Sequence, residues 1–342
     1  MYGEDAWKYC FLAYSGRSGS TLLCREIDET FPDVLVVPEF RALEHLAVAG
    51  STDGFLSVAG MNRLLRQDLQ LAEEPQVLTT ILRQLDDVNS ERLGFTDAVD
   101  LIVGERVRRS GRSVRIVLLQ FGSLPAHRAW LRSQLGDRWA GDLVIVRDPR
   151  AVTNSLLRTQ RAYHPREDMG RSDPGFCARR WKRQQAAVLR LVTGQMGSPP
   201  LVVRFEDFLA NSDSAVSPLT GLLGPINRHA AQVVRGFSIP AKERPLHPNL
   251  LSPPLVERGT AWREELDPRA QIIVEEETRE VAQELGYVIP PSTISRRWMT
   301  RWARASSARR QGLYAFRRLW HHRKQFGRIA DHLKARQMSW RP

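Results

Sequence analysis

The chain has 342 residues, of which 42% are hydrophobic, and this length is enough for one large α/β domain or two smaller ones with a real core. Its formal net charge is +12, but the excess lies in the last 50 residues, which hold 14 Lys and Arg and a single acidic residue, Asp331. The other 292 residues carry 36 basic and 37 acidic groups, so the basic character says nothing about the body of the chain.

Cysteine and histidine usage argues against a disulfide-stabilised module and against a small metal-binding module. Three cysteines give no disulfide framework, and no Cys/His cluster has the spacing of metal ligands. Cys10 and Cys24 fall in a predicted strand and the helix after it, so both are expected to be buried free thiols. No stretch of about 18 apolar residues predicts a membrane span, and no signal pattern opens the chain, so a cytoplasmic protein is expected.

The first predicted unit, Tyr9 to Glu29, consists of a strand, a glycine loop and a helix. Tyr9 to Tyr14 is an apolar run of strand length, and the apolar residues after Thr21 have helical spacing. The loop between them, Ser15 to Thr21, holds two glycines and four hydroxyl groups. A strand that runs through such a loop into a helix N-terminus forms an anion site, because free backbone N–H groups and the helix dipole face the loop.

Arg17 adds a permanent charge with a planar fork that suits phosphate or sulfate oxygens. The loop is not the usual nucleoside-triphosphate loop, G-x-x-x-x-G-K-[ST]. Gly16 and Gly19 are only three positions apart, and Ser20 stands where that pattern has lysine. A polar strand-to-helix turn without a ligand is the alternative interpretation of this segment alone.

Four more strands are predicted along the chain. They are Val34 to Val37, Val114 to Leu119, Leu143 to Val146 and Leu201 to Phe205. Leu43 to Leu101 is predicted to be mostly helical, with breaks at Gly50 to Gly54, Gly60, Pro75 and Gly94. Further helices are predicted at Ala126 to Leu135, Phe176 to Val192 and Pro268 to Leu285, whereas Gln160 to Asp173 is predicted to be a loop over the substrate.

Five strands that alternate with helices predict one α/β domain with a parallel sheet. We place this domain at residues 1–292 and a basic helical tail, rich in Trp and Arg, at residues 293–342. Glu39 follows the second strand, at the sheet edge where ligands bind in doubly wound folds. Its alternative interpretation is a surface carboxylate that pairs with Arg41.

A second motif follows the fourth strand, Arg147-Asp148-Pro149-Arg150. Asp148 is a good N-cap and Pro149 suits the first helical position. Arg147 is then expected at the strand tip and Ser155 two turns into the helix, where both can face one phosphate. Taken alone, the motif favours a simpler interpretation, in which Arg147 pairs with a surface acid.

Together the two motifs resemble sulfotransferases that use 3′-phosphoadenosine 5′-phosphosulfate (PAPS). The segment from Ser15 to Leu23 resembles the family's 5′-phosphosulfate loop, and Arg147 with Ser155 resembles its 3′-phosphate motif. Val203 to Phe208 is similar to the strand-to-helix segment that follows in the family, and Arg258 to Trp262, within a basic turn at Val256 to Arg263, is weakly similar to its C-terminal basic segment. The resemblance covers Lys8 to Pro290 and implies a P-loop-like parallel sheet flanked by helices.

The arginine in the loop and the glutamate after the second strand are closest in style to the carbohydrate, glycolipid and tyrosylprotein branches. The resemblance implies that Glu39 is the base and that Arg17 stabilises charge on the leaving phosphate. One departure is that Gln120 to Ser123 carries neither the Lys nor the His that members often place after the third strand. His127 is the candidate substitute.

The resemblance also implies the donor site and the products. The residues expected to bind PAPS are Arg17, Ser18, Gly19, Ser20, Thr21, Leu22, Arg147, Ser155, Arg258, Gly259 and Thr260. The product is adenosine 3′,5′-bisphosphate (PAP), and no metal is required. A sugar or glycolipid hydroxyl is the first choice of acceptor, and a tyrosyl, phenolic or natural-product hydroxyl is the alternative.

Two other classes of function stay open. A P-loop kinase would use ATP, although the Walker lysine and a clear Mg²⁺-binding Asp are missing. A non-catalytic scaffold would act through residues 293–342, where Trp298, Trp302, Phe316 and Trp320 form pairs four residues apart. For that tail we rank packing on its own body or on a partner first, binding to an anionic membrane second and binding to nucleic acid third. If the tail binds a membrane, the protein would be peripheral to that membrane.

Overall fold

The computed structural model describes residues 7–38, 44–47, 54–163, 173–227 and 256–305, together with residues 239, 241 and 244. Its centre is a five-stranded sheet in the order β2-β5-β1-β6-β7, in which every neighbouring pair is parallel. The strands are β1 (Lys8–Ala13), β2 (Val34–Val37), β5 (Ile116–Gln120), β6 (Trp139–Val146) and β7 (Leu201–Arg204). The predicted parallel α/β sheet is therefore confirmed.

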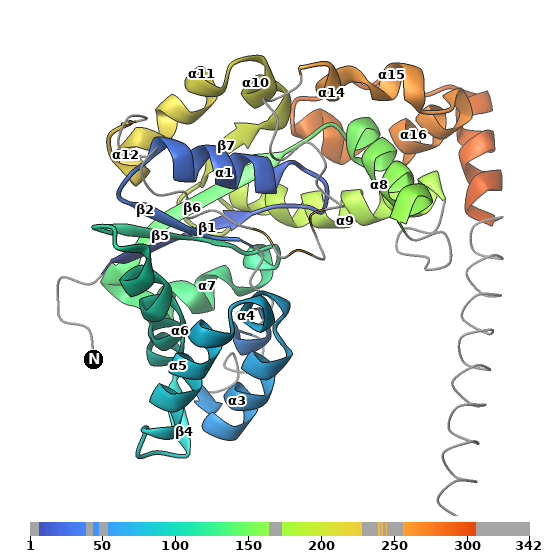
Figure 1. Ribbon diagram of the computed structural model, residues 1–342. Coiled ribbons are helices and arrows are strands. Elements are labelled where there is room, and N and C mark those ends of the chain that lie inside the picture. The colour runs from blue at the N-terminus through green and yellow to red at the C-terminus, as the bar shows by residue number, and fades with distance from the viewer. Residues whose placement is uncertain are drawn as a thin grey trace, which may run out of the picture.

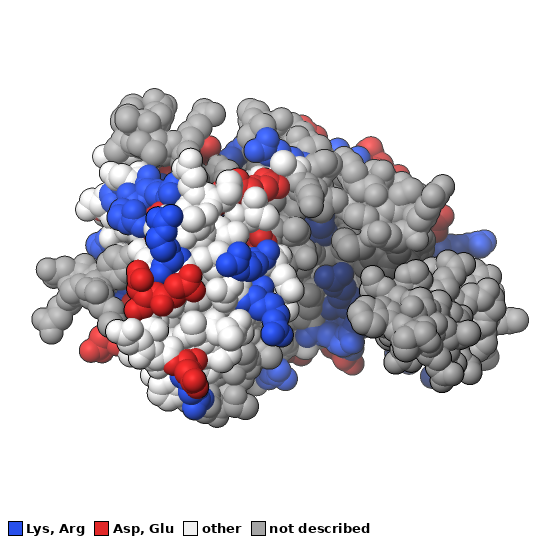
Figure 2. Space-filling model, turned by 60° about the horizontal axis from the view of Figure 1, so that its bottom comes forward, with Lys and Arg blue, Asp and Glu red and all other residues white. Residues whose placement is uncertain are grey.

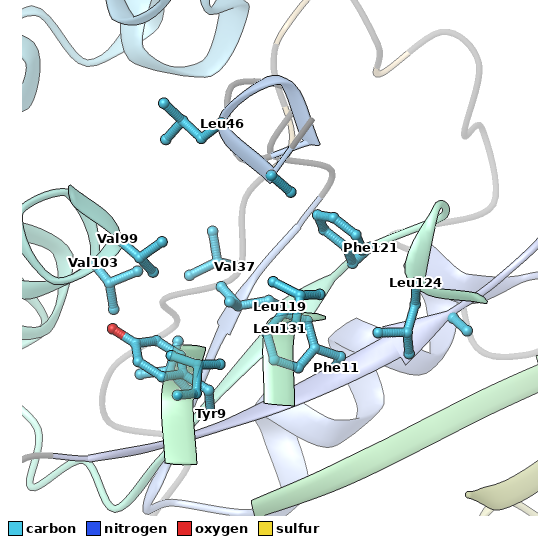
Figure 3. Close-up of a cluster of buried hydrophobic side chains, with 14 of the residues drawn as sticks. Tyr9, Phe11, Val37, Leu46, Val99, Val103, Leu119, Phe121, Leu124 and Leu131 are labelled. Carbon is cyan, nitrogen blue, oxygen red and sulfur yellow. The ribbon is translucent and has the colours of Figure 1, made fainter. Parts of the chain in front are cut away.

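Strand side chains alternate between two cores, one on each face of the sheet, as the period of two in a strand requires. One core receives Tyr9 and Phe11 of β1 with Val37 and Leu119 of the neighbouring strands, and Figure 3 shows these side chains pointing into one cluster. Cys10 and Leu12 point the other way, into the second core. Because both faces are buried, the strands are continuous apolar runs, which is typical of parallel sheets.

Helices cover both faces and make a three-layer molecule (Figure 1). The layer on the second core consists of α1 (Ser20–Thr30), α10 (Phe205–Ala210), α11 (Ser212–Val216) and α12 (Thr220–Leu223), with the 3₁₀ turn Ser217–Leu219. The layer on the first core consists of α3 (Val58–Gln67), α4 (Leu69–Glu73), α5 (Pro75–Asp86), α6 (Phe95–Ser110), α7 (Leu124–Leu135), α9 (Pro174–Val192) and α16 (Pro268–Glu284).

Helical residues 44–47 and α8 (Pro149–Tyr163) also contribute buried side chains to the first core, namely Leu46, Ala47 and Val152. The remaining elements are α14 (Glu257–Thr260), α15 (Trp262–Glu265), the 3₁₀ turn Gly136–Arg138 and helical residues 294–305. A separate antiparallel pair is made by β3 (Phe55–Ser57) and β4 (Arg92–Gly94). Among the residues that the structure describes, no helix has the length and hydropathy needed to cross a bilayer.

The structure corrects four local predictions. The region from Leu43 to Leu101 is not helical throughout, because β3 and β4 pair across it. Gly60 does not break a helix: it lies in the first turn of α3, where the Ser57 Oγ caps its N–H at 3.0 Å and leaves no room for a Cβ. The predicted loop from Gln160 is helical up to Tyr163, its residues 164–172 lie outside the described residues, and the predicted turn at Val256 to Arg263 is largely helical, in α14 and α15.

All five strands of the main sheet end on the same edge, because they are parallel. That edge carries the loop after β1, Gln120 at the end of β5, Arg147 after β6 and Phe205 after β7. Sequence segments more than a hundred residues apart therefore meet at one place.

Candidate functional site

The loop between β1 and α1 turns tightly and leaves donors unused. Arg17 has φ +70° and Gly19 has φ +93°, and the loop closes through the Ser18 N–H, which donates to the Ser15 carbonyl at 3.0 Å. The first N–H groups of a helix have no acceptor inside the helix. In the described part of the chain, the N–H groups of Gly19, Ser20 and Thr21 have no other acceptor either, and the buried Ser18 Oγ has no partner.

Gly19 is required by a close approach. A Cβ on this residue would lie 2.2 Å from the Phe205 ring, whose edge covers the loop from the start of α10. The Arg147 guanidinium stacks on the same ring, with 4.1 Å from its carbon to the ring centroid. The Phe205 ring therefore lies between Gly19 and the Arg147 guanidinium, and it fixes the position of the guanidinium.

Arg147 ties three segments together. Its Nη1 donates to the Arg17 carbonyl at 3.0 Å and its Nη2 donates to the Arg258 carbonyl at 3.1 Å. Its Nε is buried without a partner among the described residues. Burial lowers the pKa of Arg147 to about 10, against the opposing effect of Glu206, so the group is charged at neutral pH. Among the described residues it does not pair with a surface acid: it holds two main-chain carbonyls, and its Nε has no acceptor there.

The two sequence motifs meet directly. The Arg17 Nε donates to the Ser155 Oγ at 3.1 Å, although these residues are 138 positions apart. Asp148 caps α8 as predicted, because its Oδ1 accepts from the Arg150 N–H at 2.8 Å. Ser155 lies about two turns into α8, where its hydroxyl contacts the Arg17 guanidinium.

A buried charge network holds the second motif in place. The Arg150 guanidinium pairs with Asp148 and Glu275 and lies 4.0 Å over the Trp262 ring. Glu206 accepts from the Asp148 N–H at 2.9 Å and from the Tyr287 hydroxyl at 3.2 Å. Burial raises the pKa of both Glu206 and Tyr287. These groups face one another and support the site from behind.

The weakly similar C-terminal segment lies beside the same motif. Arg258 presents its carbonyl to Arg147, and its own Nη1 donates to Glu265 at 3.1 Å. Glu265 also accepts from Asn154 on α8 at 2.7 Å. Burial raises the pKa of Glu265, but hydrogen bonds from Asn154 and Arg158 and the charges of Arg158 and Arg258 outweigh it, so the pKa is lowered overall. Gly259 is buried in this segment and Thr260 is exposed.

The other predicted donor residues lie in the first turn of α1. The Ser20 Oγ accepts from the Gln120 Nε2 at 2.7 Å, so the residue that stands in place of the expected Lys or His orients a loop hydroxyl. Thr21 is buried, and the Leu22 N–H donates to the Gly19 carbonyl at 3.0 Å while its side chain packs on the second core.

Helix α9 supports the loop, which the sequence did not reveal. The Trp181 Nε1 donates to the Arg147 carbonyl at 3.1 Å, and the Gln185 Nε2 donates to the Ser15 Oγ at 3.0 Å. The Arg180 guanidinium reaches within 3.5 Å of the position of a Cβ on Gly16. Arg17, Arg147 and Arg180 therefore surround one glycine loop. The signal in the sequence was the run of Arg, Trp and Gln at 179–185, but nothing in its spacing said which face meets the loop.

The predicted base, Glu39, lies outside the described residues. The structure does describe another carboxylate at this edge, Glu44, whose Oε1 accepts from the Ser123 N–H at 3.2 Å and its Oγ at 3.3 Å. Tyr14 and Gly122 pack beside it. His127 is half-buried on α7, with its ring 6.2 Å from the Phe121 ring. Its role as a substitute stays a prediction.

Three arginines, several free N–H groups and two hydroxyls suit an anion with more than one phosphate-like group. Within the residues that the structure describes, no group of three or more His, Cys, Asp or Glu could hold a metal ion. The expectation of a metal-independent reaction stays a prediction.

Two solved structures with a similar fold are sulfotransferase domains. The chain is similar to the sulfotransferase domain from the curacin biosynthetic pathway, with 17% identity and a TM-score of 0.54 over 83% of this chain and 99% of that domain. It is also similar to the sulfotransferase domain of the Synechococcus PCC 7002 olefin synthase, with 19% identity and a TM-score of 0.54 over 84% and 98% of the two chains. No family model and no curated protein sequence matches the chain.

At these identities the likeness concerns the fold. The chain has a sulfotransferase-type fold, as the two motifs predicted. Neither comparison distinguishes the carbohydrate, glycolipid or tyrosylprotein branches.

Proposed function

We propose that the chain is a PAPS-dependent sulfotransferase that moves a sulfuryl group to the hydroxyl of an acceptor. The observation that carries the proposal is the contact between the Arg17 Nε and the Ser155 Oγ, which joins the two motifs at the carboxyl edge of the sheet. The buried Ser18 Oγ and Arg147 Nε lack partners in the described part of the chain. Buried polar groups are normally hydrogen-bonded, so these atoms fit a bound anion.

Under this proposal, a different set of residues would bind each charged group of PAPS. Arg17, Ser18 and the N–H groups of Gly19, Ser20 and Thr21 would bind the 5′-phosphosulfate. Arg147 and Ser155, with the Arg258 to Thr260 segment beside them, would bind the 3′-phosphate, which distinguishes PAPS from ATP. Bound PAPS supplies an activated sulfuryl group.

The chain's own residues would perform the rest of the chemistry. A carboxylate accepts the proton of the acceptor hydroxyl as its oxygen bonds to sulfur. The bond between sulfur and the bridging oxygen breaks, and Arg17 with the loop N–H groups stabilises the negative charge that develops on that oxygen. The acceptor we expect first is a sugar or glycolipid hydroxyl. Because the two structural neighbours belong to a natural-product pathway and an olefin synthase, aliphatic alcohols belong in the same screen as sugars and phenols.

The donor is tested by calorimetric titration with PAP, AMP and ATP. We expect binding of PAP in preference to the other two. Arg147→Ala should weaken PAP binding by roughly 1.5–3 kcal/mol, as expected for a hydrogen bond to a charged group. Arg66→Ala is the matched control, because Arg66 is exposed on α3 and bonds only to Asn62 among the described residues.

Arg147→Ala also leaves two carbonyls unpaired, so its melting temperature must be compared with that of the wild type. Ser155→Ala is the milder second variant and should weaken PAP binding without unfolding the chain. Equal binding of ATP and PAP, with both variants behaving as the wild type, would contradict the proposal and favour the kinase. Absence of nucleotide binding would favour the scaffold.

The base is tested by a pair of isosteric variants. We expect Glu39→Gln to abolish transfer to an acceptor while PAP binding stays unchanged, because a base acts on the acceptor and not on the bisphosphate. Glu44→Gln should leave PAP binding unchanged and reduce transfer less, since Glu44 already accepts two hydrogen bonds from Ser123. The measurement is sulfated product by mass spectrometry. If Glu44→Gln abolishes transfer and Glu39→Gln does not, the roles are reversed.

A further inference from the structure

One face of the C-terminal helix, residues 294–305, is attached to the body by hydrogen bonds. Arg296 donates to Glu275 and Glu276 on α16, and Arg304 donates to Glu277 at 2.6 and 2.8 Å. Thr300, between them on the helix, is buried. The first part of the basic tail therefore packs on an acidic row of its own domain, and its orientation is fixed.

The opposite face of the C-terminal helix is apolar and exposed. Ile294, Trp298 and Trp302 follow one another at intervals of four, so they form one stripe. Their exposed fractions are 78%, 66% and 73%, and they belong to a short series of large exposed hydrophobic residues in the described chain. Exposed apolar stripes of this kind mark interaction surfaces.

A row of arginines runs beside the stripe. Arg297 and Arg301 are exposed and precede Trp298 and Trp302 by one position each. Arg297 donates to the Ser292 Oγ at 3.0 Å, and no ion pair joins either arginine to a carboxylate in the described part of the chain. The outward face thus combines two indole rings with two positive charges that have no acidic partner there.

The sequence continues this composition beyond the described residues. Residues 306–342 contain 10 Lys and Arg and one acidic residue, with Trp320 and Trp340 among their aromatics. The rest of the chain differs from this basic tail in carrying both signs of charge. On the face shown in Figure 2, basic and acidic side chains are interspersed, as expected for the 292 residues that have nearly equal numbers of both.

We propose that Ile294, Trp298 and Trp302, with Arg297 and Arg301, form a docking surface for an anionic lipid bilayer. Indole rings prefer the interface between headgroups and acyl chains, and arginines beside them bind anionic headgroups. An apolar stripe with flanking arginines is the pattern of helices that lie in this interface. Nucleic acid would engage the charges without burying Ile294, and the interspersed charge on the face shown in Figure 2 offers it no wider basic footprint.

The test is cosedimentation of the full-length chain with vesicles. One set is phosphatidylcholine, and the other contains about 30 mol% phosphatidylglycerol, similar to an anionic leaflet. We expect binding to the anionic vesicles and little to the neutral ones. Trp298→Ala with Trp302→Ala should weaken the binding about tenfold or more, because two rings leave the interface. Arg297→Gln with Arg301→Gln should weaken it about fivefold for each charge.

Matched controls lie elsewhere on the surface. Phe55 is an aromatic residue with 51% exposure and a stacked arginine, so Phe55→Ala controls for the loss of an exposed ring. Arg63→Gln with Arg66→Gln removes two exposed arginines from α3. Lipids with brominated acyl chains add a direct readout, since they should quench tryptophan fluorescence in the wild type and less in the tryptophan variant. Melting temperatures check that all variants are folded.

Three outcomes would overturn the proposal. The first is absence of binding to anionic vesicles. The second is unchanged vesicle binding by the tryptophan variant, which would indicate that residues 306–342 bind the vesicles instead. The third is binding that depends on the arginines alone and is displaced by a DNA duplex, which would indicate a general polyanion site. The test is independent of the donor and of catalysis.

Discussion

Gly19 shows how one residue limits the whole site. It adopts a left-handed backbone that glycine tolerates best, and the Phe205 ring occupies the space where any other residue has its Cβ. The same ring supports Arg147. A side chain at position 19 would therefore shift the ring and, with it, the guanidinium that holds the Arg17 and Arg258 carbonyls.

We predict that Gly19→Ala destabilises the protein and abolishes PAP binding. Gly111→Ala is the matched control, because Gly111 has φ +63° but open space around its Cβ position. Both variants should lose about 1–2 kcal/mol of stability because alanine is strained in the left-handed region, and only Gly19→Ala should lose roughly 1–3 kcal/mol more through overpacking. Urea unfolding and PAP titration measure the two effects. Equal losses of stability with PAP binding retained in both variants would contradict the role of the ring.

The meeting of the two motifs could be predicted at this scale because both are local patterns, and their binding of the donor stays a proposal. A glycine loop before a helix and an arginine after a strand are each contained in about a dozen residues. Arg180, Gln185 and Phe205 could not be assigned, since their roles depend on which face of α9 and which end of β7 meet the loop. Glu44 was missed for a similar reason: its partner is Ser123, 79 residues away.

At the scale of elements, α16 joins the body of the protein to the C-terminal helix. Its acidic row is shared between the two: Glu275 pairs with Arg150 behind the second motif and also with Arg296 of the C-terminal helix. Glu277 pairs with Arg179 on α9 and with Arg304. The C-terminal helix is thus connected through two carboxylates to helices that support the site.

We predict that acid weakens this attachment through Glu276. Burial raises the pKa of Glu276, but hydrogen bonds from Ser292, Arg279 and Arg296 hold it below its ordinary value overall. A carboxylate with a lowered folded pKa stabilises the protein fully above its unfolded pKa, about 4.3, and loses that contribution as the pH falls through the folded value. The free-energy difference between wild type and Glu276→Gln should therefore be constant above about pH 5 and shrink below it.

Urea unfolding at several pH values measures this difference, and Glu264→Gln, at an exposed position on α15, serves as the control. A difference between wild type and Glu276→Gln that is as large well below pH 4.3 as at neutral pH would contradict the prediction.

At the scale of the whole molecule, the pattern of apolar residues predicted the five-stranded sheet but did not predict the small β3-β4 pair. Buried parallel strands are short apolar runs, so four were found within two residues of their true ends, and β6 was found at its end but begins four residues earlier than predicted. The β3-β4 pair has three residues in each strand and lies among helical patterns, which gave no signal. The strand order β2-β5-β1-β6-β7 was not predicted, because order depends on packing between elements far apart in sequence.

The bridge made by Arg147 also has a consequence for the order in which the protein is completed. During synthesis the glycine loop emerges first, and the strand that carries Arg147 follows more than a hundred residues later. The carbonyl that receives the second Nη group belongs to Arg258, near the end of the domain. A nascent chain that carries both motifs but stops before α14 lacks this last anchor. The proposed donor site is therefore among the last parts of the domain to be assembled, although its glycine loop is among the first segments to leave the ribosome.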